Sequence, residues 1–187
     1  SSYALCDAIA SLLPWDIFNR VGGIDPYAFT WTRKFGDFFT YLIPPGAAFG
    51  VFGDGAEEQR SEEWARFTRA FSARMPTPLL RWSAENQFGA NQTLLEMILM
   101  PVSESKTQAV FPRGTPNSRA FPSVGVVAMH SSLSERGRTS VFFRASPFGS
   151  VGHAHADQNS FVLSVAGEPI LIDSGVYDWY GSPHAVQ

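Results

Sequence analysis

The sequence predicts an α+β fold in which a helical part precedes a set of antiparallel strands. Apolar residues recur at helical spacing through about the first hundred residues, as between Leu5 and Leu12. After Pro101 the pattern changes to the alternation of apolar and polar residues that is typical of strands. Helices and strands that are segregated along a chain favour an α+β architecture. We therefore expect a multi-domain chain with a helical domain over residues 1–104 and an antiparallel β-sheet domain over residues 105–187.

Proline, glycine and capping residues set the limits of the expected helices. Pro14 is expected to end the first helix, and Asp25 with Pro26 to start the second. Ser61, followed by two glutamates, favours a third start, because acidic side chains stabilise a helix N-terminus. Apolar stripes on the second and third of these helices predict buried faces with Phe35, Phe38, Phe39 and Leu42, and with Trp64, Phe67 and Phe71. Helices are expected over residues 3–13, from Pro26 to the prolines at 44 and 45, from Ser61 to Pro76, and over 78–86 and 90–100.

Segments rich in Gly, Pro, Ser and Arg separate the expected strands. The last two apolar runs flank Gly167, which favours a hairpin. Simple pairing about that glycine would put Asp173 opposite residue 161. His130, near the end of one run, is expected at the surface. Strands are expected over residues 107–111, 124–129, 140–144, 159–165 and 169–173.

Composition excludes some partners. The 187 residues carry a net charge of −3 without a basic run, which argues against nucleic-acid binding. No apolar run approaches the roughly 20 residues that a membrane-spanning helix needs. Cys6, the single cysteine, is interpreted as a small buried apolar side chain. The chain starts at Ser1 and ends in a Tyr- and Gly-containing stretch, so we expect a fragment of a longer protein.

Residues 144–175 contain the densest group of chemically active side chains. His153, His155 and Asp157 alternate, so an extended chain would project all three to one face. Imidazoles and carboxylates are good ligands for zinc, and histidine is the usual proton-transfer group near neutral pH. Two other interpretations stay open. The histidines can be hydrogen-bonded loop residues, or part of an H-x-H-x-D-H hydrolase signature, whose last position is Gln158 here and not histidine.

The stretch R-A-S-P-F-G-S-V-G-H-A-H-A-D-Q-N-S-F, followed by G-E-P-I-L-I-D-S-G-V-Y, resembles the central β-sheet segment of heparinase II/III-type polysaccharide lyases. The Phe-rich residues 35–42, the P-P-G that follows and F-G-D-G are similar to the last part of that family's helical toroid. The resemblance implies the C-terminal part of an (α/α) toroid followed by the N-terminal part of an antiparallel β-sandwich. It also implies cleavage of a uronate-containing polysaccharide, such as alginate or a glycosaminoglycan, by β-elimination.

The resemblance assigns roles to individual residues. His153 matches the family's catalytic histidine, while His155 and Asp173 match two ligands of a structural zinc ion. The third ligand is expected beyond Gln187, with His184 as a weak local substitute. The family's catalytic tyrosine and its asparagine or histidine are expected upstream of the chain.

Three further residues are candidates for substrate binding. Arg144 can face an anionic substrate or hold the loop through an acidic neighbour. Gln158 can bind substrate, although orienting His153 or bonding backbone is favoured. Tyr180 lies in an aromatic segment that can stack on sugar rings or pack at the rim of the core.

The leading functional hypothesis is therefore a polysaccharide lyase. The alternatives are a non-catalytic, zinc-containing glycan-binding module and, less favoured, a metal-dependent hydrolase. The resemblance suggests a secreted or periplasmic location and leaves the cytoplasm open. The sequence does not select the polysaccharide, the uronate epimer, endo or exo cleavage, or the oligomeric state.

Overall fold

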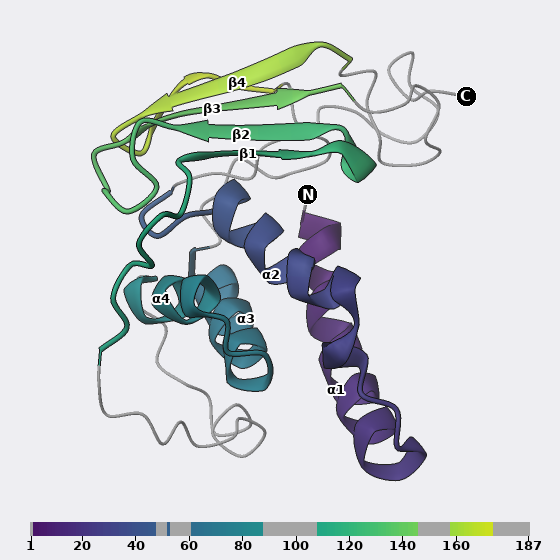
Figure 1. The fold of residues 1–187 in the computed structure, drawn as a ribbon. Coiled ribbons are helices and arrows are strands. Elements are labelled where there is room, and N and C mark those ends of the chain that lie inside the picture. Colours follow the sequence, from purple (N-terminus) through teal and green to yellow (C-terminus); the bar gives the residue numbers. More distant parts are fainter. Residues whose placement is uncertain (1, 48–51, 53–60, 88–107, 146–157, 174–187) are drawn as a thin grey trace.

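A computed structural model describes residues 2–47, 52, 61–87, 108–145 and 158–173. Within them the helices come first and the strands follow, which confirms the α+β prediction. Figure 1 shows the helices gathered below one face of a single sheet. The expected helix over 90–100 and the expected domain boundary near residue 104 lie outside the described residues. The helices are α1 (Ser2–Gly22), α2 (Thr30–Leu42), α3 (Ser61–Arg74) and α4 (Pro78–Asn86).

Helix α1 continues through Pro14, so the prediction that this proline ends the helix is wrong. An internal proline removes one backbone hydrogen bond and crowds the preceding turn. Contacts on both sides of Pro14 offset that cost. Leu12 belongs to the buried helical core, and Trp15 packs edge-on against Tyr27 at 5.6 Å between ring centroids.

Asp16 ties three helical segments together. Arg74 of α3 donates to both of its carboxylate oxygens, with the shortest contact at 2.6 Å, and the Tyr27 hydroxyl donates to it at 2.9 Å. Burial alone would raise the pKa of Asp16. The hydrogen bonds from Arg74 and Tyr27, with the arginine charge, outweigh burial and hold that pKa below its ordinary value.

The second helix begins one turn later than expected. The Asp25 side chain accepts from the Tyr27 backbone N–H at 3.0 Å, so it caps a short 3₁₀ turn over Pro26–Ala28. Helix α2 then runs from Thr30 and ends before Pro44, as predicted. Helix α4 starts with Thr77 as its N-cap and Pro78 in its first turn.

The predicted aromatic stripes of α2 and α3 meet in one core. Phe39, Phe67 and Phe71 are at most 4% exposed, and the rings of Phe67 and Phe71 stack at 5.4 Å. Gly36 allows the close approach of α4, because a Cβ there would lie 2.9 Å from a methyl carbon of Leu80. The burial of large aromatic surfaces is the main stabilising contribution in this half of the chain.

Five strands form an antiparallel sheet in sequence order. The last two are joined by Ala166 and Gly167, whose φ angles of 53° and 85° are left-handed, as a tight two-residue hairpin requires. Four predicted strands are confirmed with small shifts in their limits. The strands are β1 (Ser118–Phe121), β2 (Val126–His130), β3 (Thr139–Arg144), β4 (Ser160–Val165) and β5 (Glu168–Leu171).

The expected strand at 107–111 is wrong for its described residues 108–111, which form no strand. Phe111 packs instead against Trp82 of α4, with ring centroids 4.8 Å apart. The first strand is β1, which the sequence pattern did not indicate. It is only four residues long and pairs with β2 through Arg119 opposite Ala128.

A second core joins the helices to the sheet. Tyr41 of α2 and Trp82 of α4 pack with Ala128 of β2 and Phe142 of β3, and all four are at most 6% exposed. This face of the sheet is therefore closed by helices, as Figure 1 shows for α2 under β1 and β2.

Buried polar groups reinforce the same junction, and one of them corrects the sequence prediction. His130 is only 6% exposed, not at the surface. Its Nε2 lies 2.9 Å from the Tyr41 carbonyl oxygen, and its Nδ1 lies 2.8 Å from the Ser140 hydroxyl. Because a carbonyl oxygen can only accept, Nε2 carries the proton and Nδ1 accepts from Ser140. Long-range packing, which a local pattern does not contain, is the reason for the burial.

Arg138 fastens the end of α2 to the β2–β3 connection. It is 3% exposed and donates to the backbone carbonyl oxygens of Pro45, Leu133 and Ser132, the first at 2.8 Å. Burial, with a smaller effect from Arg136, lowers the pKa of Arg138 to about 10, so the side chain remains charged at neutral pH.

In the part of the chain that the structure describes, no helix has both the length and the apolar character needed to cross a bilayer.

Replacing Asp16 with asparagine is expected to lower the free energy of unfolding by about 2 kcal/mol, because Arg74, only 9% exposed, would lose its counter-charge. Urea unfolding measures the change. Arg81→Gln removes the exposed ion pair with Glu85 and serves as the control, with an expected loss below about 1 kcal/mol. Equal losses in the two variants would contradict the role of Asp16.

Stability is also expected to fall between pH 6.5 and pH 4. Burial, with a smaller effect from Arg138, lowers the pKa of His130 from 6.5 to about 4. The unfolded state therefore binds the proton more readily, so the stabilisation is complete above pH 6.5 and is lost as the pH falls toward 4. The pKa difference corresponds to about 3 kcal/mol.

The measurement is urea unfolding at several pH values for the wild type and for His130→Gln. Glutamine does not titrate, and its amide can still donate to the Tyr41 carbonyl oxygen. An unaltered pH dependence in the variant would show that His130 is not its source.

Candidate functional site at one edge of the sheet

Strands β3 and β4 hold the two ends of the histidine segment. His153 and His155 lie in residues 146–157, outside the described residues. Arg144 ends β3 and pairs in register with Ser160, the first residue of β4. The next residue, Ala145, is also held in place, because its backbone N–H donates to the Gly125 carbonyl oxygen at 2.7 Å. The segment that contains both histidines therefore leaves and re-enters the sheet at neighbouring positions.

Asp173 follows β5 and belongs to the same edge. Strand β5 pairs with β4 through Leu171 opposite Leu163. Continuing that offset brings Asp173 opposite Phe161, the position that simple pairing about Gly167 predicted. Because β5 ends at the side of the sheet where β4 starts, Asp173 follows β5 on that side. The Asp173 side chain is half-buried.

Gln158 and Asn159 form the turn that leads into β4. Asn159 has a φ of 59°, in the left-handed region that asparagine tolerates better than most residues. Gln158 precedes it and is half-buried. The left-handed backbone conformation at Asn159 gives that residue a structural role in the turn. Substrate binding by Gln158 stays a prediction.

Arg144 supplies a cation at this edge. The residue is half-buried at the end of β3, and its guanidinium carbon lies 6.0 Å from the centroid of the Phe52 ring. A cation over an aromatic face is attracted by the ring electrons, which helps to orient the side chain. The ends of β3 and β5 thus carry one basic residue, Arg144, and one acidic residue, Asp173. They come before and after the segment with His153 and His155 in the sequence.

His153, His155 and Tyr180 lie outside the described residues. Among the described residues, no three His, Cys, Asp or Glu side chains gather in a way that could hold a metal ion. Arg144, Gln158 and Asp173 are the candidate residues that the described strands bring to one edge.

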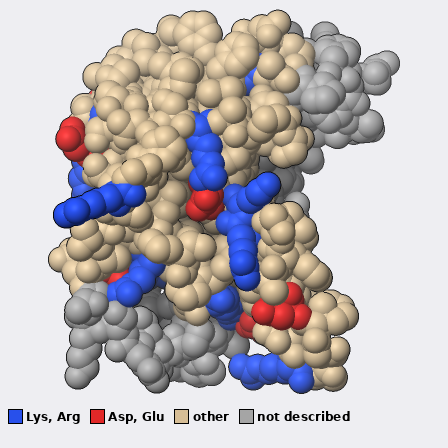
Figure 2. All heavy atoms as spheres, viewed as in Figure 1, with Lys and Arg blue, Asp and Glu red and all other residues tan. Residues whose placement is uncertain are grey.

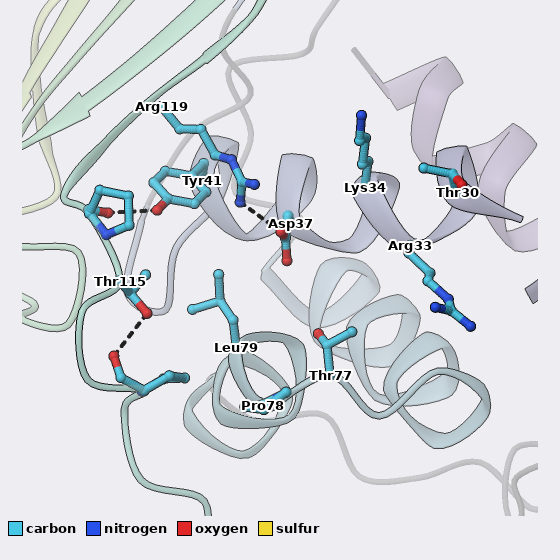
Figure 3. Close-up of a pocket in the computed structure, with 12 residues that line it drawn as sticks. Thr30, Arg33, Lys34, Asp37, Tyr41, Thr77, Pro78, Leu79, Thr115 and Arg119 are labelled. Carbon is cyan, nitrogen blue, oxygen red and sulfur yellow. Dashed lines mark hydrogen bonds and ion pairs between the residues drawn. The ribbon is translucent and has the colours of Figure 1, made fainter. Parts of the chain in front are cut away.

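A second polar feature was missed by sequence reasoning. One face of α2 carries Thr30, Arg33, Lys34, Asp37 and Tyr41, at the i, i+3, i+4, i+7 and i+11 positions that lie above one another on a helix. These side chains line a groove of about 490 Å³ between α2, the start of α4 and residues 112–119 (Figure 3). The helical spacing of these polar residues along α2 is the signal in the sequence that could have indicated the groove.

Comparison with protein families connects the sheet to known proteins. Residues 113–186 match the family described as heparinase II/III-like, C-terminal. The match covers all five strands of the sheet, together with the segment that contains His153 and His155. A search of curated proteins found no match to the chain. The β-sheet part of this chain is therefore similar to the heparinase II/III-like C-terminal family, which is the resemblance that its histidine segment predicted.

Proposed function

We propose that this chain is part of a polysaccharide lyase that cleaves a uronate-containing acidic polysaccharide by β-elimination. The observation that carries the proposal is the family match over residues 113–186, which includes the strands that anchor the histidine segment. Arg144 ends β3 and Asp173 follows β5, so both residues lie at the side of the sheet where the histidine segment leaves β3 and joins β4. Alginate and glycosaminoglycans are the substrate classes that we propose.

The reaction asks for three groups. A cation or hydrogen-bond donor must neutralise the uronate carboxylate, a base must take the proton from C5, and an acid must protonate the leaving O4. In our proposal His153 takes the C5 proton, the C5 electrons form the new double bond with C4, and the C4–O4 bond breaks. Arg144 is the described cation at this edge and is proposed to face the carboxylate. We assign the acid to no described residue.

We also propose a structural zinc ion held by His155 and Asp173. An imidazole and a carboxylate suit zinc, and Asp173 lies at the edge to which β4 returns from the histidine segment. When bound, the ion would fix the segment on the sheet and leave His153 to do the proton transfer. The ion would thus add stability without touching the substrate.

Toroid and sandwich architectures are part of the same proposal. The sheet face opposite the helices carries apolar rows, with Val127, Phe143 and Phe161 in register across three strands. Phe161 is 53% exposed. Such a face is what a second sheet would cover in a sandwich. A protein that degrades large extracellular polysaccharides would be exported, so we propose a secreted or periplasmic location.

Lyase activity is expected to raise the ultraviolet absorbance of an acidic polysaccharide, because β-elimination creates an unsaturated uronate. The chain in its full parent protein is mixed separately with alginate, heparan sulfate, chondroitin and hyaluronan. The rise is expected on at least one substrate and is expected to be lost in His153→Ala, which lacks the base.

The matched control is His130→Gln, which should keep the activity. His130 is buried at the end of β2 that lies away from Val126, the partner of Arg144. Persistence of the full rate in His153→Ala would remove that residue from the catalytic role. Absence of a rise on all four substrates, with zinc still bound, would favour the non-catalytic binding module.

Zinc binding is tested separately by metal analysis. His155→Ala and Asp173→Ala are each expected to lose most of the bound zinc and to lower the melting temperature, because ligand binding to the folded state adds to its stability. His153→Ala should retain the zinc. Unchanged zinc content in both ligand variants would contradict the assignment, and loss of zinc in His153→Ala would show that the two histidine roles are exchanged.

A further inference from the structure

The groove on α2 is separate from the sheet edge with Arg144. It lies between α2, the first turn of α4 and the segment that leads into β1. Arg119 of β1 pairs with Ala128 of the neighbouring strand β2. Arg144 lies in β3, two strands away from β1, and pairs with Val126 of β2. With a strand spacing of ~4.8 Å and a rise of ~3.3 Å per residue, the Cα atoms of these two arginines are about 12 Å apart. A ligand in the groove would therefore make contacts distinct from those at the sheet edge.

Positive charge dominates the groove although the whole chain carries a net charge of −3. Three lining residues are cationic (Arg33, Lys34 and Arg119) and one, Asp37, is anionic, which leaves an excess of two positive charges. Figure 2 shows basic side chains around an acidic one between the sheet and the helices. A local excess of this kind attracts anions against the overall charge of the protein.

The ion pair in the groove orders one of these cations. Arg119 donates to Asp37 at 2.6 Å and lies over the ring of Tyr41, 5.6 Å from its centroid. In Figure 3 the Arg119 side chain points from β1 toward Asp37 of α2. Arg119 nevertheless remains 40% exposed, so its remaining N–H groups can reach a ligand.

Arg33 and Lys34 are exposed and belong to neither described core. The opposite face of α2 supplies the buried Phe39. Among the described residues neither Arg33 nor Lys34 forms an ion pair. A solvated polar face is the ordinary explanation for such residues, but here they border a concave surface that already holds an ordered arginine.

The rest of the lining combines apolar side chains with the hydroxyl groups of Thr30, Thr77 and Thr115. Pro78 and Leu79 at the start of α4 line the groove together with Pro112 and Pro116. The Tyr41 hydroxyl holds the far wall by donating to the Pro116 carbonyl oxygen at 2.6 Å. A ligand that suits this surface has an apolar face and a negative group, and a pyranose ring with a carboxylate or a sulfate has both.

We propose that this groove binds an acidic sugar unit of the polysaccharide, away from the sheet edge where cleavage is proposed. The choice of a sugar rests on the proposed function, whereas the preference for an anion rests on the groove itself. Carboxylate and sulfate share the recognition chemistry, because Arg and Lys bind both through charge-assisted hydrogen bonds.

The test is calorimetric binding of four probes at low salt: an oligouronate, a sulfated glycosaminoglycan hexasaccharide, a neutral maltohexaose and inorganic sulfate. Lys34→Glu is expected to weaken binding of an acidic oligosaccharide roughly tenfold, and Arg33→Glu with Lys34→Glu more than that. Arg20→Glu makes the same charge change on the exposed end of α1 and is the matched control, with less than about a twofold effect. Melting temperatures verify that each variant is folded.

The two acidic oligosaccharides distinguish carboxylate from sulfate recognition, and the maltohexaose should not bind. Equal affinity in wild type and the double variant, or equal weakening in Arg20→Glu, would overturn the proposal, as would binding of inorganic sulfate as tight as that of the sugars. The outcome is independent of turnover. Lyase activity with unaltered binding in the double variant would refute the groove alone, and groove-dependent binding without ultraviolet absorbance change would refute the lyase alone.

Discussion

The contact between His130 and the Tyr41 carbonyl oxygen closes the junction on which the rest of the structure depends. It joins the last turn of α2 to β2 across 89 positions of the chain. Tyr41 also contributes its ring to the shared core and its hydroxyl to the bond with Pro116. One buried residue therefore positions the sheet, the segment before β1 and the wall of the groove. A neutral imidazole suits this place, because a buried charge would need a counter-charge there.

The functional edge depends on that junction through the regularity of the meander. Antiparallel pairing in sequence order brings the end of β3, the start of β4 and the end of β5 to one side of the sheet. A shift of the pairing between β3 and its neighbouring strands by one residue would turn the Arg144 side chain to the other face of the sheet. The helices pack against Ala128 and Phe142 on the inner face of the sheet. Because both side chains must stay buried, this packing favours a single pairing register of β2 with β3. The sheet thus holds both ends of the histidine segment in place.

Local patterns predicted the features whose causes are local. The stripe with Trp64, Phe67 and Phe71 and the hairpin at Gly167 follow from helical periodicity and turn chemistry, and the structure confirms both. Sequence reasoning failed where distant contacts decide. Pro14 stays within a helix because α3 and the turn at Tyr27 hold its flanks, and His130 is buried by a helix that ends 88 residues earlier. The groove was missed for the same reason, since its second wall at Pro116 comes 75 residues after Tyr41. The shared edge of Arg144 and Asp173 could be anticipated from the pairing of neighbouring strands, whereas the roles of His153, His155 and Tyr180 stay predictions.

The origin of the oxygen atoms in the products tests the central claim most directly. A defined acidic oligosaccharide is cleaved by the parent protein in water enriched in heavy oxygen, and the products are weighed by mass spectrometry. β-Elimination breaks the C4–O4 bond without adding water, so the product masses should sum to that of the substrate and C4 of the new non-reducing end should carry a double bond to C5 and no oxygen. Products that together exceed the substrate by one water, with heavy oxygen at the cleaved bond, would contradict the lyase and establish hydrolysis.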